Sequence, residues 1–448
     1  MSSATQPRGA PTAADATRSD SPASLPNPVR APAALQTLRY GLDPEGFFAA
    51  PRRRYGDVFT VRVLSETWVV LAHPDAVKEA FALGPEQANS GEANLTLRPL
   101  IGTRNVLLLD GEEHLARRKL VLPPFHGERM RAYEGTIRAQ ARRQIEAMSL
   151  GRPEALLPHM QELTFAVIMR CVFGLEDERR LRELGGALRS MLTWITDMRR
   201  GLVLAFLGPE RLMASRRFRD QLAEVDRQLF AEIERRRAAA DLGEREDILS
   251  MLLQARDEEG EGLSDQNLHD ELVTLLVAGH ETTAALLAWA VHELARAPEH
   301  QQRLADGEEG FTEATIAEAL RLRPPVPVVL RRLREPARIA GHDLPAGATL
   351  APSMLLVHRR PDLYPDPWRF DPTRFLGRRP VPSEWLPFGG SVRRCVGAAF
   401  ARFEARIVLE ELSAALRFAP DRERPERVGR RGPILVPARG ARVVLARR

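Results

Sequence analysis

Two short segments near the start of the chain alternate apolar and polar residues. Residues 56–63 read Gly-Asp-Val-Phe-Thr-Val-Arg-Val, and residues 68–73 form a second apolar run after a short break. Successive side chains of a strand point to opposite faces, so this pattern predicts a β-hairpin. Residues 74–83 follow with the spacing of a short helix.

The middle of the chain, residues 127–297, has apolar residues mostly three and four positions apart, which predicts helices. The clearest core-facing stripe consists of Phe218, Leu222, Val225, Leu229 and Ile233. An acidic, glycine-containing loop is expected at residues 254–265. Residues 265–296 are the longest uninterrupted helix candidate and are apolar on most sides. Such a helix is typical of the buried centre of a protein.

After Pro298 the pattern predicts a helix at residues 313–322, then short strands and turns, and a last helix at residues 397–416. The expected fold class is therefore mainly α with small β-sheets near both ends. No flexible linker divides residues 33–448, so we expect a single domain there. Residues 1–32 are rich in Ser, Ala, Thr and Pro, which predicts a disordered leader.

Composition narrows the class of protein. The chain has 65 basic and 60 acidic residues, and no basic block is interleaved with aromatic residues, so nucleic acid is not an expected partner. We expect no signal sequence and no transmembrane anchor, since no segment looks long and apolar enough. The only cysteines are Cys171 and Cys395, which excludes a disulfide framework and predicts a reducing, cytoplasmic location.

Cys395 lies in a glycine-rich loop that leads into the last predicted helix. Residues 387–397 read Pro-Phe-Gly-Gly-Ser-Val-Arg-Arg-Cys-Val-Gly. Helix N-terminal amides and nearby arginines favour a thiolate, which is a metal ligand. One cysteine without a His or Cys cluster cannot form a structural zinc site, whereas a haem needs only one strong protein ligand. The loop alone is equally compatible with an inert, buried cysteine.

The same loop resembles the haem-ligand loop of cytochromes P450. The residues that stand at that family's positions are Phe388, Gly389, Arg393, Cys395 and Gly397. The resemblance implies the cytochrome P450 fold, with haem b between the long central helix and the cysteine loop. It implies that Cys395 is the axial ligand of the haem iron, that Phe388 packs beside the thiolate, and that Arg393 reaches a haem propionate.

One position departs from the family pattern. Glycine usually stands four residues before the cysteine, where this chain has Ser391. Serine is small enough to keep the turn, but glycine adopts backbone angles that other residues avoid. The backbone angle at Ser391 is therefore the uncertain feature of this loop.

A second motif, Ala-Gly-His-Glu-Thr-Thr at residues 278–283, interrupts the apolar surface of the long helix. Buried polar groups need partners, and a glycine within a helix costs about 1 kcal/mol relative to alanine. Taken alone, the motif is compatible with Thr282 bonding its own helix and Glu281 reaching solvent or an ion pair. It also resembles the oxygen-activation segment of cytochromes P450, which implies that Glu281 and Thr282 guide protons to dioxygen. His280 stands at a variable place and is assigned no role.

A third motif pairs Glu318 with Arg321, which share one face of a predicted helix. Such pairs are common on surfaces. The match to the family's Glu-x-x-Arg helix, and to its later Pro/Phe/Arg segment with Arg374, implies a buried triad instead. Its expected role is structural: it would fix the framework behind the cysteine loop.

A fourth motif places His114 and Arg118 four residues apart in a segment that could also be a charged, solvated turn. The family commonly has a His or aromatic residue and an Arg at this spacing to bind the haem propionates. By the same resemblance Arg331 is a further propionate partner, and Arg332 is a close rival for that role.

The resemblance implies a monooxygenase that hydroxylates or epoxidises an apolar small molecule, such as a fatty acid, terpenoid or polyketide-like compound. Residues 123–130 resemble members that act on fatty acids and terpenes. Candidate pocket segments, which could also be plain core, are residues 95–101, 275–278, 326–329 and 433–435.

The chain ends about fifty residues after the cysteine and so resembles stand-alone bacterial members. These take electrons from NAD(P)H through a separate ferredoxin or flavodoxin with its reductase. We expect a monomer that docks this carrier through Arg117, Lys119, Arg394 and Arg402.

Two alternative functions stay open. One is a haem-thiolate enzyme that uses or rearranges peroxide, against which the Glu281–Thr282 pair argues. The other is a non-enzymatic haem sensor, for which no effector module is visible.

Overall fold

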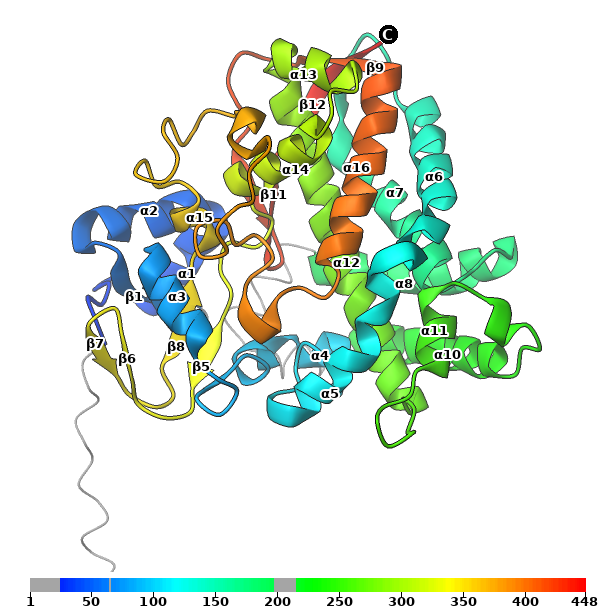
Figure 1. Cartoon of the computed structure of the whole chain (residues 1–448), viewed down its shortest axis with the longest axis horizontal. Helices are drawn as coiled ribbons and strands as arrows, with labels where there is room; N and C mark the ends of the chain where they lie inside the picture. The colour runs from blue at the N-terminus through cyan, green and yellow to red at the C-terminus, as the bar shows by residue number, and fades with distance from the viewer. Residues whose placement is uncertain (1–24, 64–65, 197–214) are drawn as a thin grey trace, which may run out of the picture.

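The computed structural model describes residues 25–63, 66–196 and 215–448. Figure 1 shows long helices on one side of the molecule and a smaller part with strands on the other. This architecture confirms the expected fold class, mainly α with small β-sheets.

The largest sheet joins the N-terminal hairpin to strands from the C-terminal half. Its strands, in order, are β1 (Val58–Val63), β2 (Glu66–Leu71), β8 (Thr349–Pro352), β5 (Arg331–Leu333) and β3 (Ala88–Asn89). The antiparallel pairing of β1 with β2 confirms the predicted hairpin, and β2 pairs parallel with β8. Because β5 begins at the buried Arg331, this sheet carries a basic side chain into the interior.

Three helices pack near this sheet: α1 (Ala33–Leu42), α2 (Pro44–Tyr55) and α3 (Pro74–Ala82). Regular packing begins before residue 33. The Val29 amide donates to the Thr60 carbonyl at 2.9 Å, and the Thr60 amide donates to the Asn27 carbonyl at 3.2 Å. Residues 25–32 therefore lie along the sheet rather than in a disordered leader. The first 24 residues of that expected leader lie outside the described part of the chain.

The longest predicted helix is α12 (Asp265–Ala295), which is capped by the Ser264 side chain accepting from the Asn267 amide. At 1.5 Å per residue it runs for roughly 46 Å. Its most apolar window has a mean hydropathy of 1.4, so by length and composition it could cross a membrane. Our expectation that no segment meets those criteria is therefore wrong. Most of that window, 72%, is buried inside the protein, as a central core helix requires.

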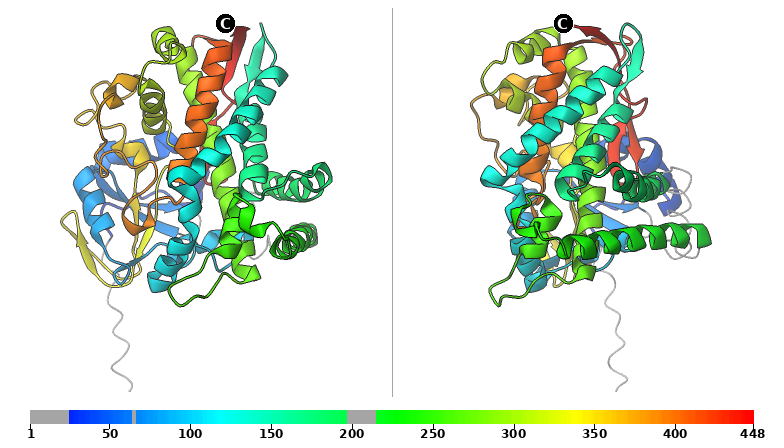
Figure 2. Two further views of the ribbon diagram at one scale, coloured as in Figure 1. Left: turned by 45° about the vertical axis from the view of Figure 1, so that its right-hand side comes forward. Right: turned by 90° about the vertical axis from the view of Figure 1, so that its right-hand side faces the viewer.

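The remaining helices lie on or beyond those that contact α12. They are α4 (Arg98–Ile101), α5 (Gly111–Val121), α6 (Glu134–Ala147), α7 (Leu156–Val167), α8 (Glu178–Thr196), α10 (Arg216–Arg237), α11 (Ile248–Gln254), α13 (Pro298–Ala305), α14 (Phe311–Leu322), α15 (Met354–Val357) and α16 (Ala398–Ala415). α7, α14 and α16 pack directly on α12. Figure 2 shows α10 lying across one end of it. The predicted helices at residues 313–322 and 397–416 correspond to α14 and α16.

The predicted helical stretch of residues 127–297 is interrupted. It begins with a 3-10 segment, Gly127–Tyr133, and contains the short strand β4 (Pro153–Ala155). β4 pairs with β12 (Arg442–Arg447), which also pairs with β9 (Leu416–Pro420). Two hairpins complete the strands: β6 (Ala337–Ile339) with β7 (His342–Leu344), and β10 (Val428–Arg431) with β11 (Ile434–Pro437). Residues 197–214 of the predicted helical stretch lie outside the described part.

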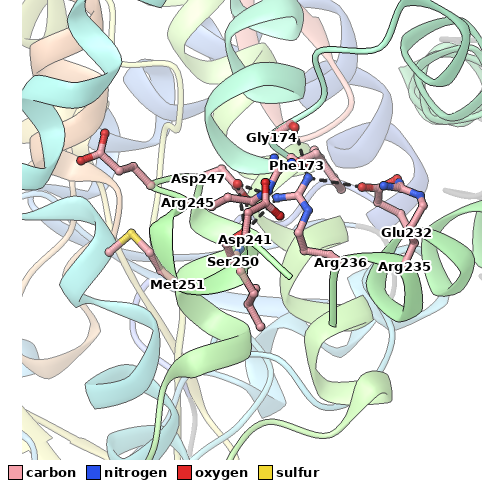
Figure 3. A network of polar contacts seen from close by, with 12 residues as sticks. Phe173, Gly174, Glu232, Arg235, Arg236, Asp241, Arg245, Asp247, Ser250 and Met251 are labelled. Carbon is pink, nitrogen blue, oxygen red and sulfur yellow. Dashed lines mark hydrogen bonds and ion pairs between the residues drawn. The ribbon is translucent and has the colours of Figure 1, made fainter. Parts of the chain in front are cut away.

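A buried polar network ties α10 to α11 and to residues 173–174, which follow α7 in the chain (Figure 3). Arg236 of α10 is 2% exposed, and its guanidinium donates to Asp247 at 2.5 Å and to the Ser250 hydroxyl at 2.8 Å. It also donates to the carbonyls of Phe173 and Gly174 at 3.1 Å. Buried charges are tolerated when they are paired and hydrogen-bonded in this way. The network therefore holds α10 against α11 and against residues 173–174.

Candidate functional site

Cys395 is held in a short loop just before α16. Its amide donates to the Phe388 carbonyl at 2.9 Å, and the amide of Gly397 hydrogen-bonds the sulfur. Burial raises the pKa of the Cys395 thiol, against the opposing effects of that amide, Arg118 and Arg394. A bound metal cation reverses this direction, because a coordinating thiol loses its proton.

The loop before Cys395 turns through backbone angles that favour glycine. Gly389 has a φ of 67° and Ser391 a φ of 58°, both in the left-handed region. Gly390 is extended, but a Cβ there would lie 2.4 Å from the ring of Phe81. The position where the family carries glycine thus does need a left-handed conformation. Ser391 keeps the turn at a conformational cost of about 1–2 kcal/mol.

The Cys395 thiol is accessible to solvent although protein surrounds it. Burial by the surrounding protein is the largest influence on its pKa. Phe388 is partly buried beside the loop, and its ring meets that of Trp385 edge to face, with centroids 6.1 Å apart.

Basic and neutral donors gather around this loop. His114 of α5 is buried, and burial, with the nearby guanidinium groups of Arg393 and Arg118, lowers its pKa to about 4. Its imidazole is therefore neutral at physiological pH and can still donate a hydrogen bond. Arg118, one turn further along α5, lies within electrostatic range of Cys395. Within the described residues the Arg118 guanidinium makes no hydrogen bond or ion pair.

The orientation of β5 shows which of Arg331 and Arg332 has its side chain on the side of the cysteine loop. Arg331 is buried, and its guanidinium donates to the Ser90 hydroxyl at 2.5 Å and to the Gly390 carbonyl at 3.0 Å. Its Nε has no hydrogen-bond partner in the described part of the chain. Arg332 points the other way and pairs with Glu92 at 3.0 Å. Alternate residues of a strand face opposite sides, so only Arg331 reaches the cysteine loop.

Sequence reasoning missed Asp110. Its carboxylate forms an ion pair with Arg393 and accepts three backbone amide hydrogens, from Ser90, Gly91 and Glu92, at 2.9 Å each. Arg393 also donates to the Leu109 carbonyl at 2.5 Å. The only signal in the sequence was an Asp directly before α5, which suggests a helix cap. In the structure it joins the residue 90–92 turn to the cysteine loop.

These side chains fit a haem. The Cys395 thiol is one of the ligand types that haem iron accepts. His114, Arg118 and Arg331 provide donors without a carboxylate partner, which suits the two propionates of the porphyrin. Across residues 25–63, 66–196 and 215–448, no three His, Cys, Asp or Glu side chains gather as an alternative metal site.

The middle of α12 opens onto an accessible space. Ala278 is exposed although the helix around it is mostly buried, and Gly279 and Thr282 are half-buried. The other candidate pocket segments are mixed: Leu95 and Pro433 are exposed, whereas most of their neighbours are buried or half-buried. Small and accessible residues at the centre of a core helix leave room for a ligand to approach that helix.

The side chains of Glu281 and Thr282 have different hydrogen-bond partners. The Gln161 side-chain amide of α7 donates to both carboxylate oxygens of Glu281 at 2.9 Å. Arg431 of β10 approaches the same carboxylate at 3.8 Å. The Thr282 hydroxyl donates to the Ala278 carbonyl at 2.5 Å, within its own helix. Both polar side chains therefore have partners, and neither Gln161 nor Arg431 was recognised from the sequence.

The Glu318–Arg321 pair is fully buried, as expected. The guanidinium of Arg321 donates to both Glu318 oxygens, at 2.6 and 2.8 Å, and to backbone carbonyls of the segment that precedes the cysteine loop. Arg374 lies farther away, 3.6 Å from Glu318. The Asp371 amide donates to Glu318 at 2.9 Å. The cluster fastens α14 to residues 358–371.

Comparison with known proteins agrees with this geometry. A sequence model described as Cytochrome P450 matches residues 25–307 and 310–444. Cytochrome P450 135B1 of Mycobacterium tuberculosis is 39% identical over 424 residues, which cover 92% of this chain and 88% of that protein. Cytochrome P450 135A1 of the same species is 38% identical over 397 residues, covering 87% of each.

Solved structures share the fold. A retinoic acid-bound cyanobacterial cytochrome P450 has a TM-score of 0.81 and 23% identity, covering 95% of this chain and 99% of that one. The heme domain of cytochrome P450DA has a TM-score of 0.79, also at 23% identity, covering 95% and 98%. The family match over most of the chain and the two mycobacterial relatives lead to one conclusion: this chain belongs to the cytochrome P450 family of haem-dependent monooxygenases.

Proposed function

We propose that this enzyme inserts one atom of dioxygen into an apolar small molecule, by hydroxylation or epoxidation. The observation that carries the proposal is the Cys395 thiol, which is accessible in the loop just before α16. A haem bound there supplies the activation of dioxygen, and thiolate ligation favours O–O cleavage.

In this proposal Cys395 would ligate the haem iron, and the Gly397 amide would steady the charge on its sulfur. Phe388 shields the loop from the core side. Arg118, Arg331 and neutral His114 donate to the propionates. Arg393 contributes its charge while Asp110 and the Leu109 carbonyl hold it in place.

Glu281 and Thr282 are proposed to carry protons to the site where dioxygen is reduced. Glu281 is a buried carboxylate that can take up or release a proton at either oxygen. The Thr282 hydroxyl lies beside the accessible part of α12, and it can leave the Ala278 carbonyl by rotating about χ1. The Thr282 hydroxyl can then order a water and pass on a proton.

The substrate is proposed to be a fatty acid, terpenoid or polyketide-like molecule. The support is the apolar character of residues 95–101, 275–278, 326–329 and 433–435, and the sequence of residues 123–130. Apolar segments with a few polar groups are the usual lining of sites for such molecules.

Electrons are proposed to come from NAD(P)H through a ferredoxin or flavodoxin and its reductase, to a monomeric, cytoplasmic enzyme. Of the four basic residues expected to dock the carrier, two already have partners. Lys119 pairs with Glu258 at 2.8 Å, and Arg117 pairs with the buried Glu271 at 3.1 Å. Arg394 and Arg402 are exposed, and within the described residues neither has an ion-pair partner, so we place the docking surface on them.

The test is turnover under ¹⁸O₂ with NAD(P)H, a ferredoxin–reductase pair and a panel of fatty acids and terpenoids. We expect one labelled oxygen atom in the product. Formation of product only from added peroxide, with no label from dioxygen, would contradict the proposal and favour a peroxide-using enzyme.

A further inference from the structure

The carboxylate of Glu281 lies where three elements meet. It is 5% exposed on α12, Gln161 of α7 donates to both of its oxygens at 2.9 Å, and Arg431 of β10 is 3.8 Å away. A buried carboxylate without donors would be strongly unfavourable, so these contacts decide where the group points. None of them involves Thr282.

His280 does not provide the counter-charge. Its Nε2 is 3.8 Å from Glu281, but burial, with Arg189 and Arg431 nearby, lowers the pKa of His280 to about 3. The imidazole is therefore neutral in the working range of the enzyme. Its neighbours are the Thr164 hydroxyl, 3.0 Å from Nδ1, and the edge-on ring of Phe165. Among the residues that the structure describes, Gln161 and Arg431 remain as the groups that hold the Glu281 charge.

The packing of α7 on α12 keeps Gln161 in place. One turn after Gln161, the Thr164 hydroxyl lies 3.1 Å from the His280 carbonyl, which sets the register between the helices. Just beyond α7, the terminal methyl of Ile168 packs near α12, 3.4 Å from where a Cβ at Gly279 would lie. Gln161 is therefore presented to Glu281 by the packing of α7 on α12.

We infer that Gln161 is a positioning residue, which with Arg431 fixes the Glu281 carboxylate in one orientation and so governs the proton supply of the reaction. The inference rests on the proton role proposed above for Glu281. Gln161 itself moves no proton, since a neutral amide is a donor that does not titrate. Arg431 belongs to the hairpin that carries the candidate pocket residues 433–435, so substrate contact with this hairpin would act on the same carboxylate.

The test compares Gln161→Met with a matched control, Gln228→Met, in the haem-loaded enzyme. Gln228 of α10 also donates its amide to a glutamate, Glu224, at 3.0 Å, but far from α7 in sequence and on a different helix. The first measurement is the infrared carboxyl band of Glu281, identified as the band lost in Glu281→Gln. The second is the share of NAD(P)H electrons that appears as hydrogen peroxide.

We expect Gln161→Met to shift the Glu281 band and to change the peroxide-to-product ratio roughly tenfold, the scale of one hydrogen bond to a charged group. Gln228→Met should do neither. An unmoved band together with an unchanged ratio, while Glu281→Gln changes that ratio, overturns the inference. If Gln161→Met is not recovered with haem, Arg431→Gln replaces it, because Arg431 is half-buried on a hairpin; the same two outcomes then decide.

A different result separates this inference from the proposed proton role. If Glu281→Gln leaves the ratio unchanged, the proton role of Glu281 fails. The infrared band alone then decides the positioning claim: a shift in Gln161→Met supports it, and an unmoved band overturns it.

Discussion

At the scale of single residues, Ser391 shows how the cysteine loop tolerates a departure from the family pattern. Its φ of 58° is left-handed, and it stands two residues after Gly389, which is also left-handed. Such angles place the Cβ of an L-residue close to the following carbonyl oxygen. The loop therefore carries local strain four residues before the proposed haem ligand.

Ser391→Gly should stabilise the protein. Relief of the left-handed conformation contributes about 1–2 kcal/mol, and the extra freedom of glycine in the unfolded chain offsets roughly 0.5–1 kcal/mol of it. A net gain of about 1 kcal/mol would appear as a higher thermal midpoint. Ser149→Gly is the control, because φ is not positive there and glycine should destabilise. A loss of stability in Ser391→Gly would refute this account of the turn.

Thr282→Ala should uncouple the reaction while leaving the fold intact. Alanine is a better helix former than threonine, and the substitution removes only the hydroxyl that donates to Ala278. Haem content and NAD(P)H consumption should persist, while product per NAD(P)H falls about tenfold in favour of peroxide. Equal product and peroxide yields in the variant and the parent enzyme would remove Thr282 from the mechanism.

At the scale of elements, His269 connects α10, α12 and the loop before α5. Its ring nitrogens lie 2.9 Å from Asp226 of α10 and 3.0 Å from Asp270 of α12. Asp270 in turn accepts the backbone amides of Thr103 and Arg104 at 2.8 and 2.9 Å. The ring of Phe230 stacks on His269 with centroids 4.8 Å apart. One charged imidazole thus joins three segments around the N-terminal part of α12.

This connection should weaken at alkaline pH. Burial lowers the pKa of His269, but the hydrogen bonds to Asp226 and Asp270 outweigh it and raise the pKa to about 9. Because the folded value lies above the unfolded value of about 6.5, the stabilisation is fully present below pH 6.5 and is lost as pH rises through 9. The shift corresponds to at most about 3 kcal/mol.

The measurement is the thermal midpoint of the parent protein and His269→Asn at pH 6 and at pH 9.5. The parent should be clearly more stable at pH 6, and the difference should shrink at pH 9.5. A difference of the same size at both pH values would contradict the assigned charge on His269.

The Glu318–Arg321 pair also connects elements, because it fastens α14 to the segment before the cysteine loop. Arg321→Ala leaves a buried, unpaired carboxylate and should cost about 3–5 kcal/mol. We expect little haem-loaded protein from this variant. Arg142→Ala, which removes an exposed guanidinium from its pair with Glu411, should cost little stability, because solvent screens such a pair. If the Arg321→Ala protein folds and binds haem normally but does not turn over substrate, Arg321 has a catalytic role instead.

At the scale of the whole molecule, the elements that could be predicted were those with a local pattern. The β1–β2 hairpin, α12 and α16 each show their period within one stretch of sequence. The parallel pairing of β2 with β8 joins segments about 280 residues apart and leaves no local pattern. The break at Gly127–Tyr133 was missed because 3-10 and α-helical spacings look alike over seven residues.

The residues of the candidate site also fall into two groups, those that the sequence could predict and those that it could not. Cys395, Arg393, Glu281 and Thr282 lie in motifs, so the sequence alone could name them. Asp110, Gln161 and Arg431 contact those residues from other elements, and only the packing of those elements reveals them. The choice of Arg331 over Arg332 likewise depends on which face of β5 is buried.

The central claim is that Cys395 binds the haem iron as a thiolate, and the most direct test is the carbon monoxide difference spectrum of the reduced protein. The parent protein and Cys171→Ser should both show the thiolate-type Soret band, because Cys171 is buried in the apolar core and burial raises the pKa of its thiol. Cys395→Ser should lose that band. A Cys395→Ser protein that keeps the band, with its loss in Cys171→Ser, would contradict the account.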